Sequence, residues 1–250
     1  MKQRITIFVA IAALGGFAGW FVLQKLGQQA ALTPENSTPT PAAPAVDVAA
    51  LQTKADAGDP AAETSLGWAY QKGTGVKPDM KAAYKWFQQA ANQNYPEALA
   101  ALGEMTQAGQ GTHVNLAEAA RLYQLAAERG SVAGQYNLAY LYEQGSGVAK
   151  NEPAAAKWYE LAAQGGDSIA QYDIGQRYML GVGVQTNFVQ ALKWLTLASA
   201  QGQTDASHLI PDVTGKMNSD QIADAKKQAD QFAAHPVVLT NATAAVSSPN

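Results

Sequence analysis

GDPAAETSLGWAYQKGTGVKPDMKAAYKWFQQAANQ, which occupies residues 58–93, is a 36-residue unit that recurs three more times without a gap. The later copies occupy residues 94–129, 130–165 and 166–201, so the four copies fill most of the chain after residue 57. A repeat period between about 20 and 50 residues is typical of solenoids, in which each unit buries its apolar face only against its neighbours. The sequence therefore predicts a row of four similar units, none of which folds alone.

Each copy carries two glycines, two residues apart, where an apolar stretch ends: Gly73 and Gly75, Gly109 and Gly111, Gly145 and Gly147, and Gly181 and Gly183. Glycine suits this place because the residue after the last helical turn commonly takes a left-handed conformation, which glycine adopts without strain. Four residues after the second glycine stands an Asp or Asn, whose side chain can cap the next helix. These capping residues are Asp79, Asn115, Asn151 and Asn187. One copy is therefore predicted to be a helix, a seven-residue turn and a second helix.

Apolar residues follow helical spacing in both halves of the unit. In the first half of copy one, Ala62, Leu66 and Tyr70 lie four residues apart, which places them on one face of a helix. In the second half a large apolar residue recurs in one register, as Trp86, Leu122, Trp158 and Trp194. Each predicted helix pair therefore has an apolar face that it can bury against the next pair.

The shared pattern is A-x3-LG-x2-Y-x2-G-x-GV, then an N-cap residue, then KA-x2-W-x3-AA. It resembles the Sel1 family, a relative of the tetratricopeptide repeats, over residues 58–201. Copy two departs from it, with Thr106, Thr112 and Leu122 in place of the Tyr, the Val and the Trp. The resemblance implies an all-α, right-handed α-solenoid built of helix-turn-helix repeats, with weaker packing inside copy two.

Residues 1–28 form a predicted membrane segment. Lys2 and Arg4 precede nineteen residues, 5–23, without a charge, which as a helix nearly span a hydrocarbon core of about 30 Å. Two interpretations stay open, an uncleaved signal anchor or a signal peptide cleaved near residues 16–18. We expect the anchor, because the run stays apolar beyond that site. The charges before it then predict a single-pass protein of the bacterial inner membrane with its repeats in the periplasm, whereas cleavage would release the repeats there.

The remaining segments lie between this anchor and the repeats, and after them. Residues 29–45 include four prolines and are predicted to be an extended linker. Residues 46–57 are amphipathic and are predicted to form an N-terminal capping helix. Residues 202–235 are predicted to be a partial repeat that breaks at Pro211, followed by a C-terminal capping helix with Ser219 as N-cap. Residues 236–250 are predicted to be a disordered tail.

Composition and motifs point away from catalysis. The net charge is −3 and there is no cysteine, which argues against a nucleic-acid partner, a disulfide framework and a thiolate metal site. His113, His208 and His235 lack a second ligand at metal-binding spacing. No motif of a nucleophile elbow, phosphate loop or metalloprotease helix occurs. We therefore expect no enzymatic activity, no catalytic residues, no cofactor and no metal.

Surface residues of the first helices remain as candidates for binding. In tetratricopeptide-like stacks the matching positions line a concave groove, and Trp and Tyr there can anchor a partner. The predicted groove residues are Trp68, Gln71, Glu104, Gln107, Tyr136, Tyr140, Glu143, Tyr172 and Gln176. They predict a non-catalytic scaffold for a protein or peptide ligand. The competing interpretation is that these aromatic residues pack against adjacent helices.

Two further functions stay open. Cysteine-rich secreted Sel1 relatives have been linked to β-lactam or peptidoglycan chemistry, so the resemblance leaves a hydrolase or binding protein of that kind as an alternative. This chain lacks their cysteines and a nucleophile with a base at recognisable spacing. The second alternative is a subunit of a membrane complex that is held by the transmembrane helix.

Overall fold

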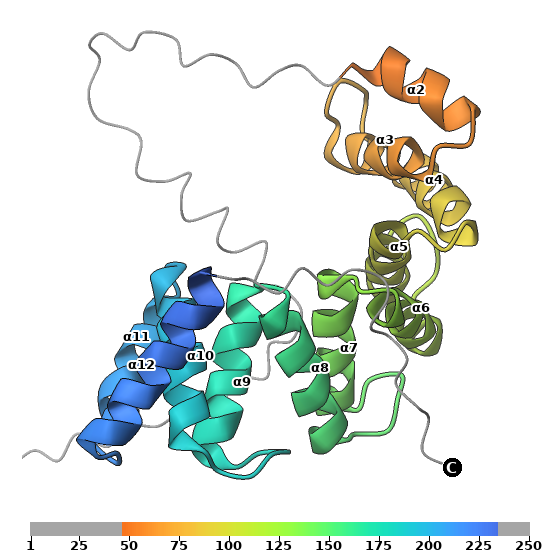
Figure 1. The fold of residues 1–250 in the computed structure, drawn as a ribbon. Helices are drawn as coiled ribbons and strands as arrows, with labels where there is room; N and C mark the ends of the chain where they lie inside the picture. Colours follow the sequence, from red (N-terminus) through yellow and green to blue (C-terminus); the bar gives the residue numbers. More distant parts are fainter. Residues whose placement is uncertain (1–46, 235–250) are drawn as a thin grey trace, which may run out of the picture. The chain divides into compact units, whose positions relative to one another are not determined.

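The structure is a computed structural model that describes residues 47–234, and these residues fold into paired α-helices (Figure 1). The helices are α2 (Val48–Asp56), α3 (Pro60–Lys72), α4 (Met80–Asn92), α5 (Pro96–Ala108), α6 (Leu116–Glu128), α7 (Val132–Gln144), α8 (Glu152–Gln164), α9 (Ser168–Leu180), α10 (Phe188–Ala200), α11 (Thr204–Thr214) and α12 (Ser219–Ala234). Between residues 47 and 234 no helix has the length and hydropathy of a membrane span. The predicted anchor (1–28), linker (29–45) and tail (236–250) lie outside the described residues.

The predicted repeat of helix, turn and helix is confirmed in all four copies. Each first helix and each second helix is thirteen residues long. Every first helix ends at the first glycine of the turn, which has a left-handed φ between 68° and 76°. Within a copy the two helices pack against each other, and the second helix packs against the first helix of the next copy. The chain is therefore an α-solenoid.

The predicted N-caps are also confirmed. Asp79 Oδ1 accepts hydrogen bonds from the backbone amides of Lys81 and Ala82 at 2.9 and 3.0 Å. Asn115, Asn151 and Asn187 each accept one such bond from the third residue of the following helix, at 3.0 to 3.1 Å. A glycine that ends the first helix and an Asp or Asn that caps the second helix thus lie at the two ends of a seven-residue turn. They provide hydrogen bonds to backbone groups at the helix ends that would otherwise lack partners.

The second glycine of the turn joins one repeat to the one before it. Gly111, Gly147 and Gly183 have φ of 70°, 74° and 73°. A Cβ atom on any of them would overlap a backbone carbonyl oxygen in the preceding repeat, which belongs to the first residue of its second helix: Met80, Leu116 and Glu152, respectively. Only glycine fits at these positions, because the backbones touch and φ is positive.

The core lies between the helices of each pair and between neighbouring pairs. The large buried residues of the second helices occupy one register, as Phe87, Tyr123, Tyr159 and Leu195. Glycines of the first helices face three of them, since Gly67 contacts Phe87 and Gly103 contacts Tyr123 in the same way as Gly175 contacts Leu195. Small residues thus let the two helices of a pair approach closely.

Two predictions about the C-terminal part are wrong. The helix α11 does not break at Pro211 but continues through it to Thr214. The proline removes one helical donor, and the carbonyl group that loses it belongs to Ser207, an exposed residue that water can reach. The N-cap of α12 is Asn218, not Ser219, because Asn218 and Gln221 exchange side-chain to backbone hydrogen bonds of 2.9 and 3.0 Å, a capping box.

The helix α12 covers the last repeat. Its Phe232 ring lies edge-on to the ring of Trp194 on α10, with 5.3 Å between the centroids. Ala225 and Ala229 are buried in the same interface, and the outward side chains of α12 are polar. This arrangement closes the apolar end of the helix stack, as capping units of repeat proteins do.

Gly147→Ala is expected to destabilise the protein more than Gly166→Ala. Both glycines have positive φ, 74° and 92°, so alanine carries roughly 1–2 kcal/mol of left-handed strain at either position. At Gly147 the new Cβ also overlaps the Leu116 carbonyl oxygen, whereas at Gly166 it meets no atom within 4 Å. We expect Gly147→Ala to cost about 3 kcal/mol or more, measured by urea unfolding. Equal losses would show that the glycine contact does not stabilise the stack.

Candidate functional site

Four of the predicted groove residues share one register on the first helices. Trp68, Glu104, Tyr140 and Gln176 hold this register on α3, α5, α7 and α9. Glu104 is exposed and the other three are half-buried. First helices of consecutive repeats contact one another, α3 with α5 and α5 with α7. The register therefore runs along one side of the helix stack and remains open to solvent.

At the start of this face, Trp68 both packs and remains accessible. Its ring lies edge-on to buried Phe87 with 4.9 Å between centroids, and Lys72 Nζ lies 5.1 Å from the ring centroid. Glu104 on the next helix interacts electrostatically with Lys72, which lowers the carboxyl pKa, while desolvation by the surrounding protein raises it and dominates. The side chain of Glu104 itself is exposed to solvent.

Gln71, Gln107 and Glu143 share a second register, and the structure gives each a partner within the protein. Gln71 Nε2 donates to Gln110 Oε1 across 3.2 Å, which links α3 to the turn after α5. Gln107 Oε1 accepts a bond of 2.9 Å from the hydroxyl of buried Tyr123. Glu143 Oε2 accepts one of 2.7 Å from the hydroxyl of Tyr159. These side chains therefore satisfy internal polar groups, and they are less available to a ligand than the first register.

Tyr136 and Tyr172 occupy a third register and are half-buried. The ring of Tyr136 lies edge-on to that of Tyr159, with 5.5 Å between centroids. Tyr172 accepts a 2.7 Å hydrogen bond at its hydroxyl from Gln176 Nε2. The two tyrosines thus pack against neighbouring side chains while each remains partly accessible. Both roles considered for the groove aromatics, partner binding and packing against adjacent helices, are therefore compatible with their positions.

A buried charged cluster between copies three and four was missed by the sequence reasoning. Arg177 on α9 is only 5% exposed. Its guanidinium pairs with Glu143 at 2.7 Å and with Glu152 at 2.8 Å, and lies 5.0 Å from the centroid of the Tyr159 ring. The other copies place Ala69, Met105 and Leu141 in this register, all buried. The sequence does contain one indication of this cluster, because Arg177 is a charged residue in a register that is apolar in the other three copies.

Asp173 adds a further carboxyl group to the cluster. Desolvation raises its pKa to about 7, with a further contribution from Glu143, and Arg177 partly offsets the shift. Three carboxyl groups, of Glu143, Glu152 and Asp173, thus accompany one buried guanidinium. The cluster joins α7, α8 and α9 by charged contacts at the junction of copies three and four.

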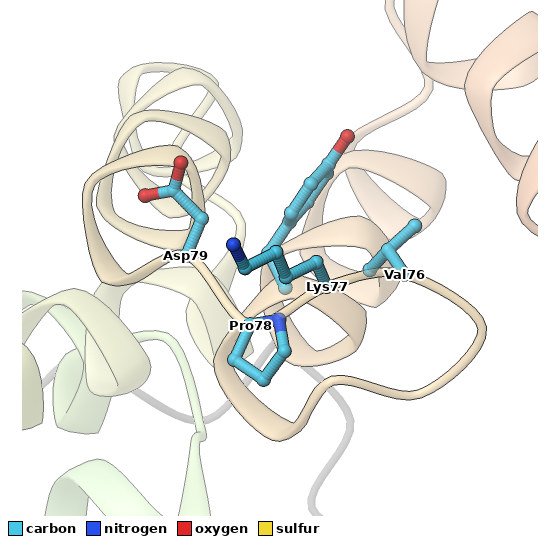
Figure 2. A pocket seen from close by; sticks show the side chains of 5 residues that line it. Val76, Lys77, Pro78 and Asp79 are labelled. Atoms are coloured by element: carbon cyan, nitrogen blue, oxygen red, sulfur yellow. The ribbon is translucent and has the colours of Figure 1, made fainter.

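Chemistry elsewhere in the described residues is sparse. In residues 47–234 no group of three His, Asp or Glu side chains is placed to hold a metal ion. An open pocket beside the first turn is lined by Tyr70, Val76, Lys77, Pro78 and Asp79 (Figure 2). The Asp79 carboxylate in this pocket is the N-cap of α4 and accepts hydrogen bonds from the amides of Lys81 and Ala82. We therefore assign the pocket residues a structural role in the turn.

The fold and this face define a class of protein, an α-solenoid of helix pairs with a solvent-accessible row of aromatic and polar side chains. Family models match the Sel1 repeat at residues 60–95, 96–131, 132–167 and 168–203. These consecutive matches cover more than half of the chain with the same period. The chain belongs to the Sel1 repeat family.

Solved structures of similar fold come from bacteria. A protective antigen of uropathogenic Escherichia coli with an SLR fold is 29% identical with a TM-score of 0.65, over 74% of this chain and 41% of that one. A Sel1 repeat protein from Oxalobacter formigenes is 32% identical with a TM-score of 0.63, over 66% of this chain and 48% of that one. The match spans less than half the length of either relative. A comparison with curated proteins found no match.

Asp173→Asn is expected to stabilise the protein more at pH 8 than at pH 5. The folded-state pKa of about 7 exceeds the value near 3.9 of an unfolded aspartate, so the folded chain keeps this proton to higher pH. The carboxyl group therefore costs no stability below about pH 4; its cost grows between about pH 4 and pH 7, where only the unfolded chain is ionised, and stays constant at higher pH. Asparagine cannot ionise. The gain in unfolding free energy should increase by about 1 kcal/mol or more between the two pH values; a gain independent of pH would contradict the raised pKa.

Proposed function

We propose that this protein is a non-catalytic scaffold that binds an extended segment of a partner protein along the first helices of its repeats. The observation that carries the proposal is the register of Trp68, Glu104, Tyr140 and Gln176, which stays accessible although the helices around it are packed. Large aromatic side chains in such a position supply contact area with little loss of conformational entropy.

The spacing of the repeats suits an extended ligand. Helices in contact lie about 8–10 Å apart, and an extended chain advances about 3.3 Å per residue. Every third residue of a bound segment can therefore reach the register position on the next helix. Trp68 and Tyr140 would provide the anchoring contacts, and Glu104 would accept a hydrogen bond or pair with a positive charge of the ligand.

The absence of catalysis is part of the proposal. Glu143 and Glu152 are both paired with Arg177, and Glu143 also accepts a hydrogen bond from Tyr159. His113 and His208 are both exposed. Carboxylates that are paired with a buried arginine in this way favour a structural role over acid-base or nucleophilic chemistry.

We also propose that the repeats face the periplasm and are held at the inner membrane by residues 1–28. The support comes from the sequence: nineteen uncharged residues follow two basic ones, and a proline-containing segment separates them from the repeats. A tethered scaffold of this kind would present its binding face at a limited distance from the membrane.

Photo-crosslinking from the accessible register tests the binding face. A photoreactive amino acid at Tyr140 or Gln176 of the full chain is expected to capture a partner in cells, and Glu104→Lys should weaken this capture because it reverses the charge of the face. The same amino acid at exposed Glu128, on α6, is the matched control. Capture from Glu128 that equals capture from Tyr140, unaffected by Glu104→Lys, would place the binding surface elsewhere.

Membrane fractionation tests the tether. The full chain is expected to stay with the membrane after a high-salt wash, and its repeats to be digested when protease is added to spheroplasts, because a spanning helix holds them outside the cytoplasm. Mass spectrometry of the mature N-terminus provides the control. A mature chain that begins near residue 19 and washes off the membrane would favour the cleaved, periplasmic form.

A further inference from the structure

Copy two lacks the large aromatic residue that the other copies place on their second helix. Trp86, Trp158 and Trp194 share one register, which Leu122 occupies on α6. The indole packs into the core at this register: Trp194 is 1% exposed, and Trp86 and Trp158 are half-buried. Leucine at the same place has a smaller side chain and no ring.

A pocket lies where the ring is missing. It opens between α4 and α6 above α5, with Leu99, Leu122 and Leu125 among its lining residues. Leu99 and Leu122 are buried and form its apolar floor, while Gln88 and Asn92 are exposed and place amide groups at its rim. The amide oxygens are suitable acceptors for an indole N–H group.

Copy two nevertheless keeps the cation that accompanies the aromatic register. The residue before the register is basic in all four copies, as Lys85, Arg121, Lys157 and Lys193. In copy four Lys193 Nζ lies 4.1 Å from the centroid of the Trp194 ring, a cation–π contact. In copy two Arg121 lines the pocket instead.

The guanidinium of Arg121 is held ready for such a contact. Glu118 accepts two hydrogen bonds from it, at 2.9 and 2.7 Å, which fix its plane. The Arg121 side chain remains 59% exposed, so a face of the guanidinium is free. A planar cation beside a pocket with a leucine floor and a polar rim complements the electron-rich face and the N–H group of an indole ring, and indole is the ring that binds cations best.

We propose that the pocket between α4 and α6 is a docking site for a tryptophan side chain of a partner protein. This side chain takes the place that the chain's own indole takes in copies one, three and four. Its ring packs on Leu122, its π face meets the Arg121 guanidinium, and its N–H group donates to an amide oxygen at the rim. The lining contains none of the accessible-register residues Trp68, Glu104, Tyr140 and Gln176, so the site is independent of the function proposed above.

A photoreactive tryptophan probe tests the site on the full chain in membranes. The probe is a short Gly/Ser peptide with one diazirine-substituted tryptophan, and crosslinked residues are located by mass spectrometry. We expect crosslinks on α4 and α6 that an unmodified tryptophan peptide suppresses and the same peptide with leucine does not.

Two variants and one control identify the contacts. Leu122→Trp fills the pocket with the residue that three sister copies carry, and Arg121→Gln removes the cation from the surface without altering the core. Each should reduce the crosslink yield about tenfold, which corresponds to about 1.4 kcal/mol. Lys157→Gln removes the matching cation of copy three, where Trp158 occupies the register, and should leave the yield unchanged. Circular dichroism during heating shows whether each variant is folded.

Three results would overturn the proposal. The first is a crosslink yield on α4 and α6 that is the same for a folded Leu122→Trp variant as for the parent. The second is equal suppression by the tryptophan and leucine peptides, which would indicate a nonspecific apolar contact. The third is suppression by free tryptophan at the same concentration as the peptide, which would indicate a small-molecule site.

Discussion

Consecutive repeats meet at the second glycine of each turn, and the rest of the stack depends on this contact. Gly111, Gly147 and Gly183 bring their backbone against the first carbonyl group of the second helix in the preceding repeat. A side chain there would hold the two repeats apart, so the apolar faces of the helices could not close on each other. Every turn begins at a glycine that ends the first helix and ends at the Asp or Asn that caps the second helix. The second glycine of the turn therefore lies at the same place in each copy.

Charge replaces apolar packing at one junction of this regular frame. Arg177 lies in a register where its counterparts are buried apolar residues, and burying a guanidinium is costly unless acidic partners surround it. Glu143 and Glu152 from the preceding repeat provide them. Removing either acidic partner would leave the buried guanidinium with a single carboxylate, so the three residues depend on each other. The junction of copies three and four therefore holds its geometry by directional contacts, and Asp173 makes it sensitive to pH near neutrality.

Features that depend on a few neighbouring residues were predictable from the sequence. The period, the glycine stops and the N-caps are all local, and the structure has each of them. Helix continuation through Pro211 was not predictable, because it depends on whether the freed carbonyl group reaches water. Among the predicted groove residues, Gln107 and Glu143 meet buried tyrosine hydroxyls sixteen residues away. Such partners are set by packing between helices, which periodicity alone does not give. The Arg177 cluster could have been predicted from the sequence by comparing the residues of one register across the four copies.

A position that differs in one copy while the others agree is not required by the frame that all copies share, and this makes it a candidate for a separate role. Arg177 is such a departure on a first helix, and Leu122 is one on a second helix. The first lies beside the accessible register that ends at Gln176, and the second opens a pocket between α4 and α6. Because the two departures fall on different helices of the pair, contacts at one do not use the residues of the other. The two proposed sites therefore do not share residues, and a partner that engaged both would be retained more strongly than either site alone allows, since the second contact would form within the same complex.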